Sequence, residues 1–296
     1  MSTVALVNGQ YELGDFLFGE DGTNAPPYRV EEFSPDTPAL ETNDLGIPDE
    51  DGLRMGAEYR RGRLLTFKMN VLTRGSALDA LDDLEAAWDG DTYRQYPEAY
   101  TTLRMKRGGR TRRVYGRPRR FSATTIRSTL GWVPVTADFQ CIHHHYFDDS
   151  TKESTVTIVP PTTGGFTVPF YVPFSVTGSS GSRTGSITVN GKHPSWPVYT
   201  IYGPITYPII EMVGIGSIPL SISLSELQSL EIDTRPWVRR VTRNDGVNLA
   251  GLIDPFASAL KDMYIPPGTW NFLLKGIDPT GTSYLTINWL DAHGSY

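Results

Sequence analysis

The sequence predicts a mainly β protein with one α-helix, in which an N-terminal β-rich domain is followed by an antiparallel β-sandwich. Its 296 residues include 29 Gly, 22 Pro and 15 Tyr, a composition that suits many short strands joined by tight turns. Apolar residues alternate with polar ones in several segments, whereas one long segment has the helical period. Beyond residue 165, turn-forming residues recur about every 8–12 residues, which is typical of a two-sheet sandwich.

The chain begins with a predicted hairpin, an arm and a strand. The first 20 residues predict a strand hairpin with Asn8-Gly9 at its turn. Residues 21–50, rich in Pro, Asp and Glu, predict an extended arm that lies on another surface, because so long a loop is unusual inside a compact domain. A strand follows over Arg63–Leu72, and its buried face consists of Leu65, Phe67, Met69 and Val71.

A helix is predicted over Ser76–Trp88, where the period of the apolar residues changes to about 3.6. Ser76 is a suitable N-cap, and Gly90 stands where a left-handed residue commonly ends a helix. The apolar stripe of this helix consists of Leu78, Leu81, Leu84 and Trp88.

Two further features complete the N-terminal domain. Thr101–Met105 and Arg112–Tyr115, joined by Gly108-Gly109, predict a second hairpin. Thr124–Thr129 and Val133–Ile142, separated by Leu130-Gly131, predict two more strands, and alternation over Val133–Cys141 gives the second strand one buried face. The sequence Pro-Pro-Thr-Thr-Gly-Gly that ends at Gly165 then marks a boundary. We therefore expect a first domain over residues 1–150, a linker over 151–165 and the sandwich over 166–296.

Charges are segregated along the chain, although the net charge is only −6. One stretch contains eight acidic residues and no basic one: Glu31, Glu32, Asp36, Glu41, Asp44, Asp49, Glu50 and Asp51. A later stretch contains nine basic residues and no acidic one: Arg104, Lys106, Arg107, Arg110, Arg112, Arg113, Arg117, Arg119 and Arg120. These two sets are the candidate subunit-interface residues.

Three interpretations of the basic stretch remain open. It could contact nucleic acid, because Lys and Arg release counterions from phosphate. It could be a solvated hairpin, or it could meet an acidic surface of a neighbouring subunit. The sequence favours the last, because the acidic arm of the same chain supplies such a surface.

Catalysis, cofactors and metals have little support in the sequence. There is no G-x-S-x-G motif and no glycine-rich phosphate loop, and Cys141 lies within an alternating strand. We therefore expect no enzyme activity and no cofactor. The run His143-His144-His145-Tyr146-Phe147-Asp148-Asp149 offers histidine and carboxylate ligands for a metal. Adjacent residues of a strand point to opposite faces, however, so at most His143 and His145 could share an ion. A strand end with solvated histidines, and no metal site, is the favoured interpretation.

The single cysteine excludes an intrachain disulfide framework and favours synthesis in a reducing compartment, or indifference to one. The N-terminal residues have neither the basic region nor the apolar core of a signal peptide. No run of about 18 apolar residues occurs, so we expect no membrane insertion.

Several segments carry a family resemblance through their order and spacing. In the first half they are Arg61–Phe67, Leu78–Trp88 and Arg112–Arg117. In the second half they are Pro197–Pro208, Leu230–Thr234 and Ile265–Asn271, before a closing strand that ends in Trp289. With these segments, the sequence resembles the distal tail proteins of long-tailed bacteriophages, or siphophages, which are also called minor tail proteins.

The resemblance implies a structural protein of the virion tail tip, assembled in the host cytoplasm, with an N-terminal belt domain and a galectin-like sandwich. Six copies would form a homohexameric ring that joins the tail tube protein to the baseplate. Its channel would pass the tape-measure protein and, in transit, DNA. The galectin-like domain would dock other tail-tip or receptor-binding proteins.

The alternative function is a carbohydrate-binding module that attaches the virion to the host cell surface. The second half offers aromatic residues that could stack on a sugar, including Trp196, Trp237, Trp270 and Trp289. A tryptophan in a sandwich more often packs in the core, and no lectin-like polar site can be identified. A structural role is therefore favoured.

Overall fold

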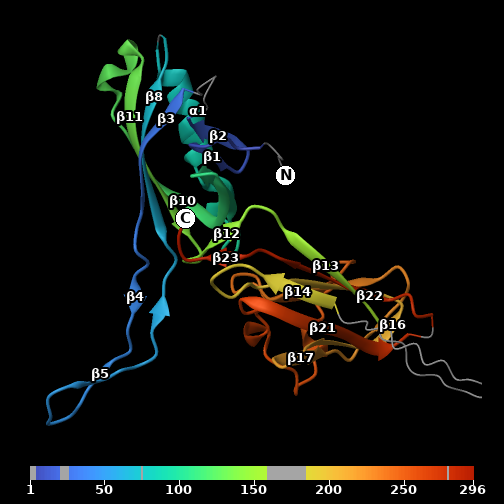
Figure 1. Cartoon of the computed structure of the whole chain (residues 1–296). Coiled ribbons are helices and arrows are strands. Elements are labelled where there is room, and N and C mark those ends of the chain that lie inside the picture. The colour runs from blue at the N-terminus through green and yellow to red at the C-terminus, as the bar shows by residue number, and fades with distance from the viewer. Residues whose placement is uncertain (1–4, 21–26, 75, 159–184, 279) are drawn as a thin grey trace, which may run out of the picture. The chain divides into compact units, whose positions relative to one another are not determined.

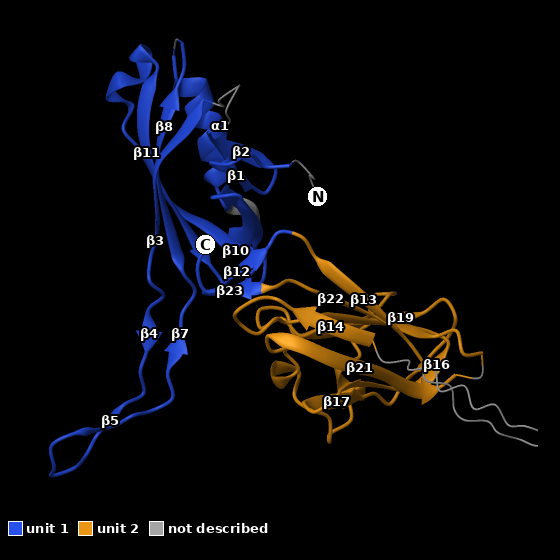
Figure 2. Cartoon of the chain, viewed as in Figure 1, with its two compact units in different colours: residues 1–149, 292–296 blue, residues 150–291 orange. Residues whose placement is uncertain are grey.

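The computed structural model describes residues 5–20, 27–74, 76–158, 185–278 and 280–296. The chain divides into two compact units (Figure 2), of which unit 1 comprises Met1–Asp149 with Ala292–Tyr296 and unit 2 comprises Ser150–Asp291. Antiparallel strands dominate both units, and one α-helix in the described residues exceeds two turns, so the predicted mainly β fold class with one helix is confirmed. Within these residues, no helix has both the length and the apolar character that crossing a membrane requires.

The limits of the two units differ from the domain limits expected from the sequence. The predicted linker over 151–165 begins with strand β13 (Lys152–Thr157), which pairs with β22 (Tyr284–Trp289) inside unit 2. The last five residues of the chain return to unit 1. Most of the remaining linker lies in residues 159–184, outside the described part of the chain.

Unit 1 is built on one antiparallel sheet with the strand order β2-β1-β9-β10-β11-β8-β3 (Figure 1). Its strands are β1 (Gln10–Leu13), β2 (Phe16–Gly19), β3 (Tyr28–Pro35), β8 (Leu64–Leu72), β9 (Thr101–Arg107), β10 (Arg110–Ala123), β11 (Trp132–Cys141), β12 (Tyr146–Asp148) and β23 (Ala292–His293). Its helices are α1 (Leu78–Trp88), the short α2 (Asp91–Arg94) and the 3-10 helix η1 (Thr125–Leu130). The strand predicted over Thr124–Thr129 is therefore wrong.

The core of unit 1 lies where α1 packs against the sheet. All the predicted core residues of β8 and of β11 are buried, which confirms both alternating patterns. The Trp88 ring lies 5.8 Å from the rings of Phe67 and Phe18, and its Nε1 donates a hydrogen bond to the carbonyl oxygen of Asp138 at 3.1 Å. This tryptophan therefore fixes the end of the helix on the sheet.

The helix differs from its prediction at both ends. Its N-cap is Ala77, and Leu78 is 42% exposed. The buried stripe is Ala77, Leu81, Leu84 and Trp88, whose spacings of four, three and four residues follow the helical period, whereas Leu78 is displaced from that stripe. Gly90 has an ordinary φ of −82°, because the chain continues directly into α2 instead of ending in a left-handed residue.

The first hairpin also turns at another place than predicted. Leu13 pairs with Phe16, so its turn is Gly14-Asp15. The Gly9 N–H donates instead to the carbonyl oxygen of Lys106 on β9, at 2.8 Å. The second hairpin is confirmed: Arg107 pairs with Arg110 across Gly108-Gly109, and both glycines have the positive φ that this tight turn requires, 55° and 74°.

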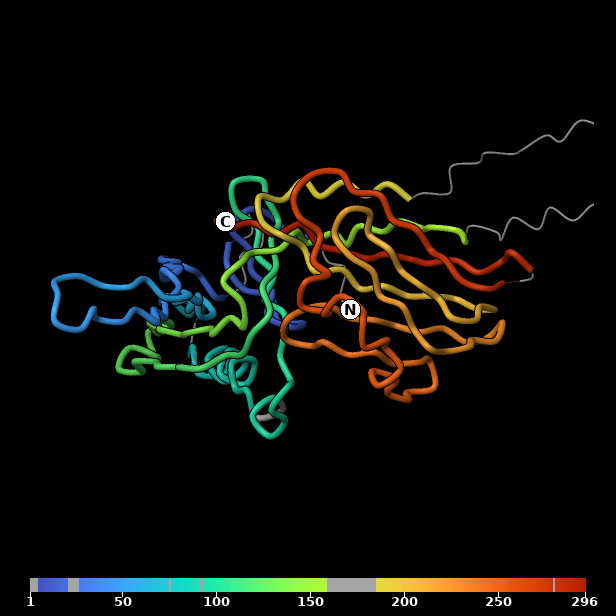
Figure 3. Tube along the Cα trace, turned by 90° about the horizontal axis from the view of Figure 1, so that it is seen from below, coloured from blue at the N-terminus to red at the C-terminus, as the bar shows by residue number. Residues whose placement is uncertain are grey.

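An arm leaves the sheet of unit 1 between β3 and β8. It is a two-stranded ribbon whose strands lie side by side (Figures 1 and 3). Its paired segments are β4 (Leu40–Glu41) with β7 (Tyr59–Arg60), and β5 (Leu45–Gly46) with β6 (Leu53–Arg54). The arm expected over residues 21–50 is therefore wrong in its bounds: Tyr28–Pro35 is strand β3 of the sheet, and the arm is a hairpin that extends to β7.

Unit 2 is an antiparallel sandwich. One sheet has the order β13-β22-β15-β19-β20 and the other β14-β21-β16-β17, with β18 beside β16. The further strands are β14 (Gly185–Val189), β15 (Val198–Tyr202), β16 (Ile205–Met212), β17 (Gly216–Pro219), β18 (Ser223–Leu224), β19 (Ser229–Asp233), β20 (Arg240–Arg243) and β21 (Gly268–Ile277), with 3-10 helices η2 (Ala250–Leu252) and η3 (Leu260–Asp262). Both sheets contribute to one core, in which Tyr199 contacts Phe272.

The environment of Cys141 leads to a first prediction. Burial raises the pKa of this thiol to about 12, so almost none of it is thiolate near neutral pH. We expect no reaction with a disulfide reagent such as DTNB at pH 8 while the protein is folded. In guanidinium chloride, one thiol per chain should react. Rapid labelling of the folded protein would contradict the buried position of Cys141.

Candidate assembly interface

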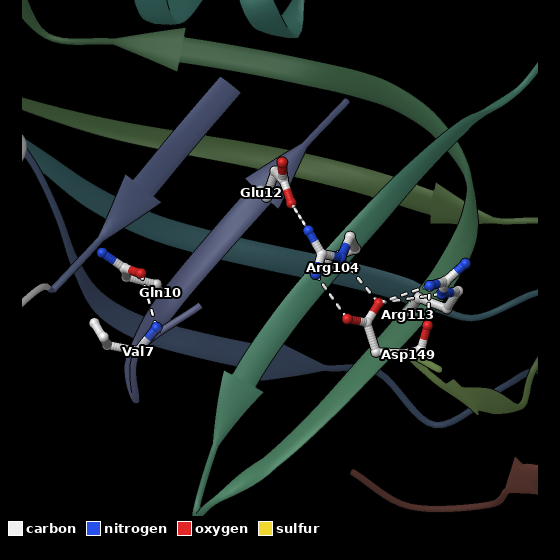
Figure 4. A network of polar contacts seen from close by, with 6 residues as sticks. All are labelled: Val7, Gln10, Glu12, Arg104, Arg113 and Asp149. Carbon is white, nitrogen blue, oxygen red and sulfur yellow. Dashed lines mark hydrogen bonds and ion pairs between the residues drawn. The ribbon is translucent and has the colours of Figure 1, made fainter. Parts of the chain in front are cut away.

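The basic hairpin contains an ion-pair network within unit 1 (Figure 4). The Arg104 guanidinium donates to both carboxylate oxygens of Asp149, at 2.9 and 2.7 Å, and also to Glu12. Arg113 donates to Oδ1 of the same Asp149, at 3.2 and 2.9 Å. Glu12, whose side chain is only 3% exposed, is thereby neutralised. Two of the predicted interface arginines therefore serve the interior of their own unit.

Strand register explains why this network is needed. Glu12, Arg104 and Arg113 lie opposite one another across β1, β9 and β10. Like charges that face each other across strands destabilise a sheet. Asp149 lies between the two guanidinium groups and bonds both. Burial by itself would raise the pKa of Asp149, but the hydrogen bonds and positive charges of Arg104 and Arg113 hold this pKa below its usual value.

Three more of the basic residues have partners within unit 1. Arg112 faces the opposite side of β10 and pairs with Asp148, whose carboxylate also lies 3.1 Å from Nε2 of His293. Arg117 donates to the carbonyl oxygens of Tyr96, Pro97 and Ala99 at 2.5–2.6 Å. The Arg107 guanidinium lies 5.2 Å from the centre of the Phe33 ring.

The remaining basic residues form no ion pair with another described residue. They are Lys106, Arg110, Arg119 and Arg120, and all but Lys106 are exposed. Arg119 and Arg120 follow Pro118 on β10, where the pairing with β11 shifts register. We call these four the free basic set. The structure thus divides the basic stretch into a paired set and a set available to another molecule.

The acidic residues divide in the same way. Glu31 accepts a hydrogen bond from Asn70, Glu32 pairs with Lys68 at 2.7 Å, and Glu41 pairs with Arg61. The Asp44 carboxylate accepts the Gly56 N–H at 2.8 Å. For Asp36 it is the backbone N–H that donates, to the carbonyl oxygen of Leu64 at 2.8 Å, while its side chain is exposed. Three exposed carboxylates at the tip of the arm have no polar partner among the described residues: Asp49, Glu50 and Asp51.

The arm also exposes large apolar side chains. Leu45 is 68% exposed and Met55 is 79% exposed, and Leu40, Leu53 and Tyr59 are similarly uncovered. The paired segments of the arm are only two residues long, and an isolated two-stranded ribbon is marginally stable in water. Exposed apolar side chains gathered on a projecting element are typical of a surface that another protein covers.

The aromatic residues of unit 2 are engaged in packing. Trp289 is buried, and Nε1 of Trp270 donates to the carbonyl oxygen of Pro266 at 2.9 Å. Trp196 and Trp237 contact each other edge to face at 6.5 Å. These contacts do not by themselves define a sugar platform.

No family model matches this chain, and no curated protein matches it in sequence. Solved structures do share its fold. One of them is the SPP1 Dit protein (gp 19.1), described as a paradigm of hub adsorption apparatus in phages that infect Gram-positive bacteria. The two sequences are 11% identical, and the structures superpose with a TM-score of 0.58 over 96% of this chain and 98% of the Dit chain. A chain of the phage P2 baseplate in its activated conformation with Ca has 12% identity, coverages of 94% and 97%, and a TM-score of 0.51. At such low identity, the similarity shows the fold alone.

The acidic partners of the basic hairpin are not among the interface candidates that the sequence indicates. Asp148 and Asp149 follow the histidine run, and Asp149 lies 36 residues after Arg113 and 45 residues after Arg104. The available signal was the predicted hairpin register, which places Arg104 opposite Arg113 and therefore requires a carboxylate close by.

The network yields a stability prediction. Asp149→Asn leaves Arg104 and Arg113 facing each other without the negative charge between them. We therefore expect the free energy of unfolding of unit 1 to fall by about 2–3 kcal/mol. This is less than the loss for a fully buried ion pair, because these side chains keep some contact with solvent. Denaturant titration followed by circular dichroism would measure it. The control is Glu41→Gln, which breaks an exposed pair and should cost less than about 1 kcal/mol. Equal effects of the two substitutions would refute the central role of Asp149.

The lowered pKa of Asp149 predicts that the stability of unit 1 depends on pH. The folded-state pKa of this carboxylate is lowered, so its stabilisation is present above the unfolded-state value of about 3.9 and is lost as the pH falls through the folded-state pKa. The stability difference between wild type and Asp149→Asn should therefore be full at pH 6 and shrink below about pH 4. A difference that grows on acidification would contradict this assignment.

Proposed function

We propose that this chain is a structural component of the tail tip of a long-tailed bacteriophage, and that unit 1 assembles with copies of itself into a closed ring. The fold shared with phage hub and baseplate proteins over nearly the whole chain supports the first part. Two different, complementary surfaces on one unit support the second, because a head-to-tail ring needs a heterologous interface.

The arm is the observation that carries the ring proposal. Its tip presents Asp49, Glu50 and Asp51, and its flanks present apolar side chains that unit 1 leaves uncovered. We propose that the arm lies on a neighbouring copy, with its tip against Arg119 and Arg120. Arg112 and Arg113, which the sequence alone would select for this contact, already have partners in their own unit.

The finer assignments follow from the family resemblance. The ring would contain six copies, join the tail tube protein to the baseplate, and leave a channel for the tape-measure protein and for DNA in transit. Unit 2, as a galectin-like sandwich, would dock other tip or receptor-binding proteins. A stable ring contact should bury more than roughly 1,000 Å² of surface.

Mass photometry and negative-stain imaging of the purified full chain test the proposal directly. We expect closed rings of a single subunit number. Monomers alone, from low to high protein concentration and at low salt, would contradict ring assembly while leaving the fold unaffected.

Charge reversal tests the arm tip. Glu50→Lys with Asp51→Lys should raise the concentration for half-assembly about tenfold, since two exposed ion pairs per contact are each worth about 0.2–1 kcal/mol. Asp49 is left unchanged because its φ is 61°. Adding Arg119→Glu and Arg120→Glu should restore assembly. The matched control, Glu226→Lys with Asp262→Lys, makes the same charge change at exposed sites of unit 2 and should have no effect. Failure of the rescue would refute the proposed pairing.

Apolar contacts of the arm are tested separately. Leu45→Ser with Met55→Ser removes only exposed side chains, so the melting temperature of the monomer should stay within about 1 °C. Assembly should nevertheless be lost, because these side chains would be buried against the next copy. Leu227→Ser with Phe256→Ser, at comparably exposed positions of unit 2, is the control. Normal rings from the arm variant would remove the arm from the interface.

A further inference from the structure

Three histidine side chains converge just after β11. The sequence predicted a strand here, in which neighbouring side chains diverge. The structure instead bends the chain at residues 142–144, and the rings of His143, His144 and His145 gather together. Their ring centres are 4.4, 4.8 and 3.9 Å apart for the pairs 143–144, 143–145 and 144–145. One nitrogen from each ring lies within 4.8 Å of the other two.

The turn that presents these rings is anchored on both sides. Nε and Nη2 of Arg63 donate to the carbonyl oxygen of His144, at 3.3 and 3.2 Å. The His145 N–H donates to Nδ1 of His143 at 3.3 Å, and His145 itself is only 6% exposed. Beyond the turn, β12 pairs with both β10 and β23. The backbone is therefore held, and only ring rotations are needed to rearrange the three imidazoles.

We propose that His143, His144 and His145 form a binding site for a late first-row divalent metal ion, with Zn²⁺ as its best-suited occupant. Imidazole is a ligand that Zn²⁺, Ni²⁺ and Cu²⁺ accept readily, whereas Ca²⁺ and Mg²⁺ require oxygen ligands. Zn²⁺ also has no electronic preference for a geometry, which suits three consecutive residues. Three protein ligands leave a fourth position for water.

The distances fit this ion after a small adjustment. With Zn–N bonds of about 2.1 Å and tetrahedral angles, ligand nitrogens lie about 3.4 Å apart. The three nitrogens, now within 4.8 Å of one another, must therefore close by at most about 1.4 Å. The rings of His143 and His144, now stacked with 26° between their planes, must also turn so that both planes meet at the ion. Such a rotation gives up the weak 3.3 Å hydrogen bond that the His145 N–H donates to Nδ1 of His143.

A bound ion would tie the end of β11 to the start of β12. Because the unfolded chain does not hold the three ligands in place, binding should stabilise unit 1. At a free zinc concentration of 100 times Kd, we expect the melting temperature of unit 1 to rise by about 5–10 °C. Since the site lies within unit 1, this effect is independent of ring assembly.

The experiment uses the untagged full chain, freed of metal with EDTA, at pH 7.5. Calorimetric titration with ZnCl₂ should show one ion per chain, and Co²⁺ in its place should give the strong visible absorption of a tetrahedral site. CaCl₂ should give no heat of binding. The double variant His143→Gln with His145→Gln should bind zinc at least tenfold more weakly, and His193→Gln, which alters a histidine of unit 2, should bind like wild type.

Because His145 is buried, the double variant could lose its fold, so His144→Gln is measured as well with circular dichroism as a check. Weakened binding by a folded His144→Gln protein supports the site. Zinc binding that is unchanged in both variants, or no stoichiometric binding by the wild type, overturns it.

Discussion

The position of Asp149 between Arg104 and Arg113 is the interaction on which the rest of unit 1 depends. The hairpin of β9 and β10 stands in the middle of the sheet, with β1 on one side and β11 on the other. Its register sets the two arginines opposite each other, on the face away from the buried Leu103, Met105 and Val114. A slip of one residue in either strand would move that strand's buried side chains to the other face. Packing thus imposes a repulsion, which the carboxylates of Asp149 and Glu12 offset.

This constraint decides which charges remain for assembly. The sequence shows how many basic residues the stretch contains, but not which of them pair within their own subunit. Only residues without such a partner can pair with another subunit. Arg104, Arg112 and Arg113 already pair with carboxylates of their own unit. Replacing any of these arginines would therefore lower the free energy of unfolding of unit 1. The free basic set and the arm tip remain, and they lie on separate elements of unit 1, as a head-to-tail contact requires.

How much the sequence could predict follows from the range of the interactions involved. The strand β8, the helix α1 and the glycine turn at 108–109 depend on local periodicity and local φ, so their patterns identified them. The arm has two-residue strands and exposed apolar residues, which give no period, so it was predicted as a loop. The bend at His143–His145 was missed because Arg63, 81 residues away from His144 in the sequence, holds it.

The same reasoning explains why a boundary near residue 150 describes only part of unit 1. Asp148 and Asp149 lie at the end of β12, where the chain leaves unit 1, and they can neutralise the arginines only while β12 stays paired with β10. Strand β23 holds β12 in place by pairing with Tyr146 and Phe147, and the Tyr296 ring contacts both Phe33 and Tyr146. The Tyr296 hydroxyl also donates to the carbonyl oxygen of Arg110 at 3.1 Å. The last five residues therefore help to position the carboxylates of Asp148 and Asp149, which neutralise the arginines of the basic hairpin. Unit 1 thus needs the C-terminal residues of the chain as well as its first half.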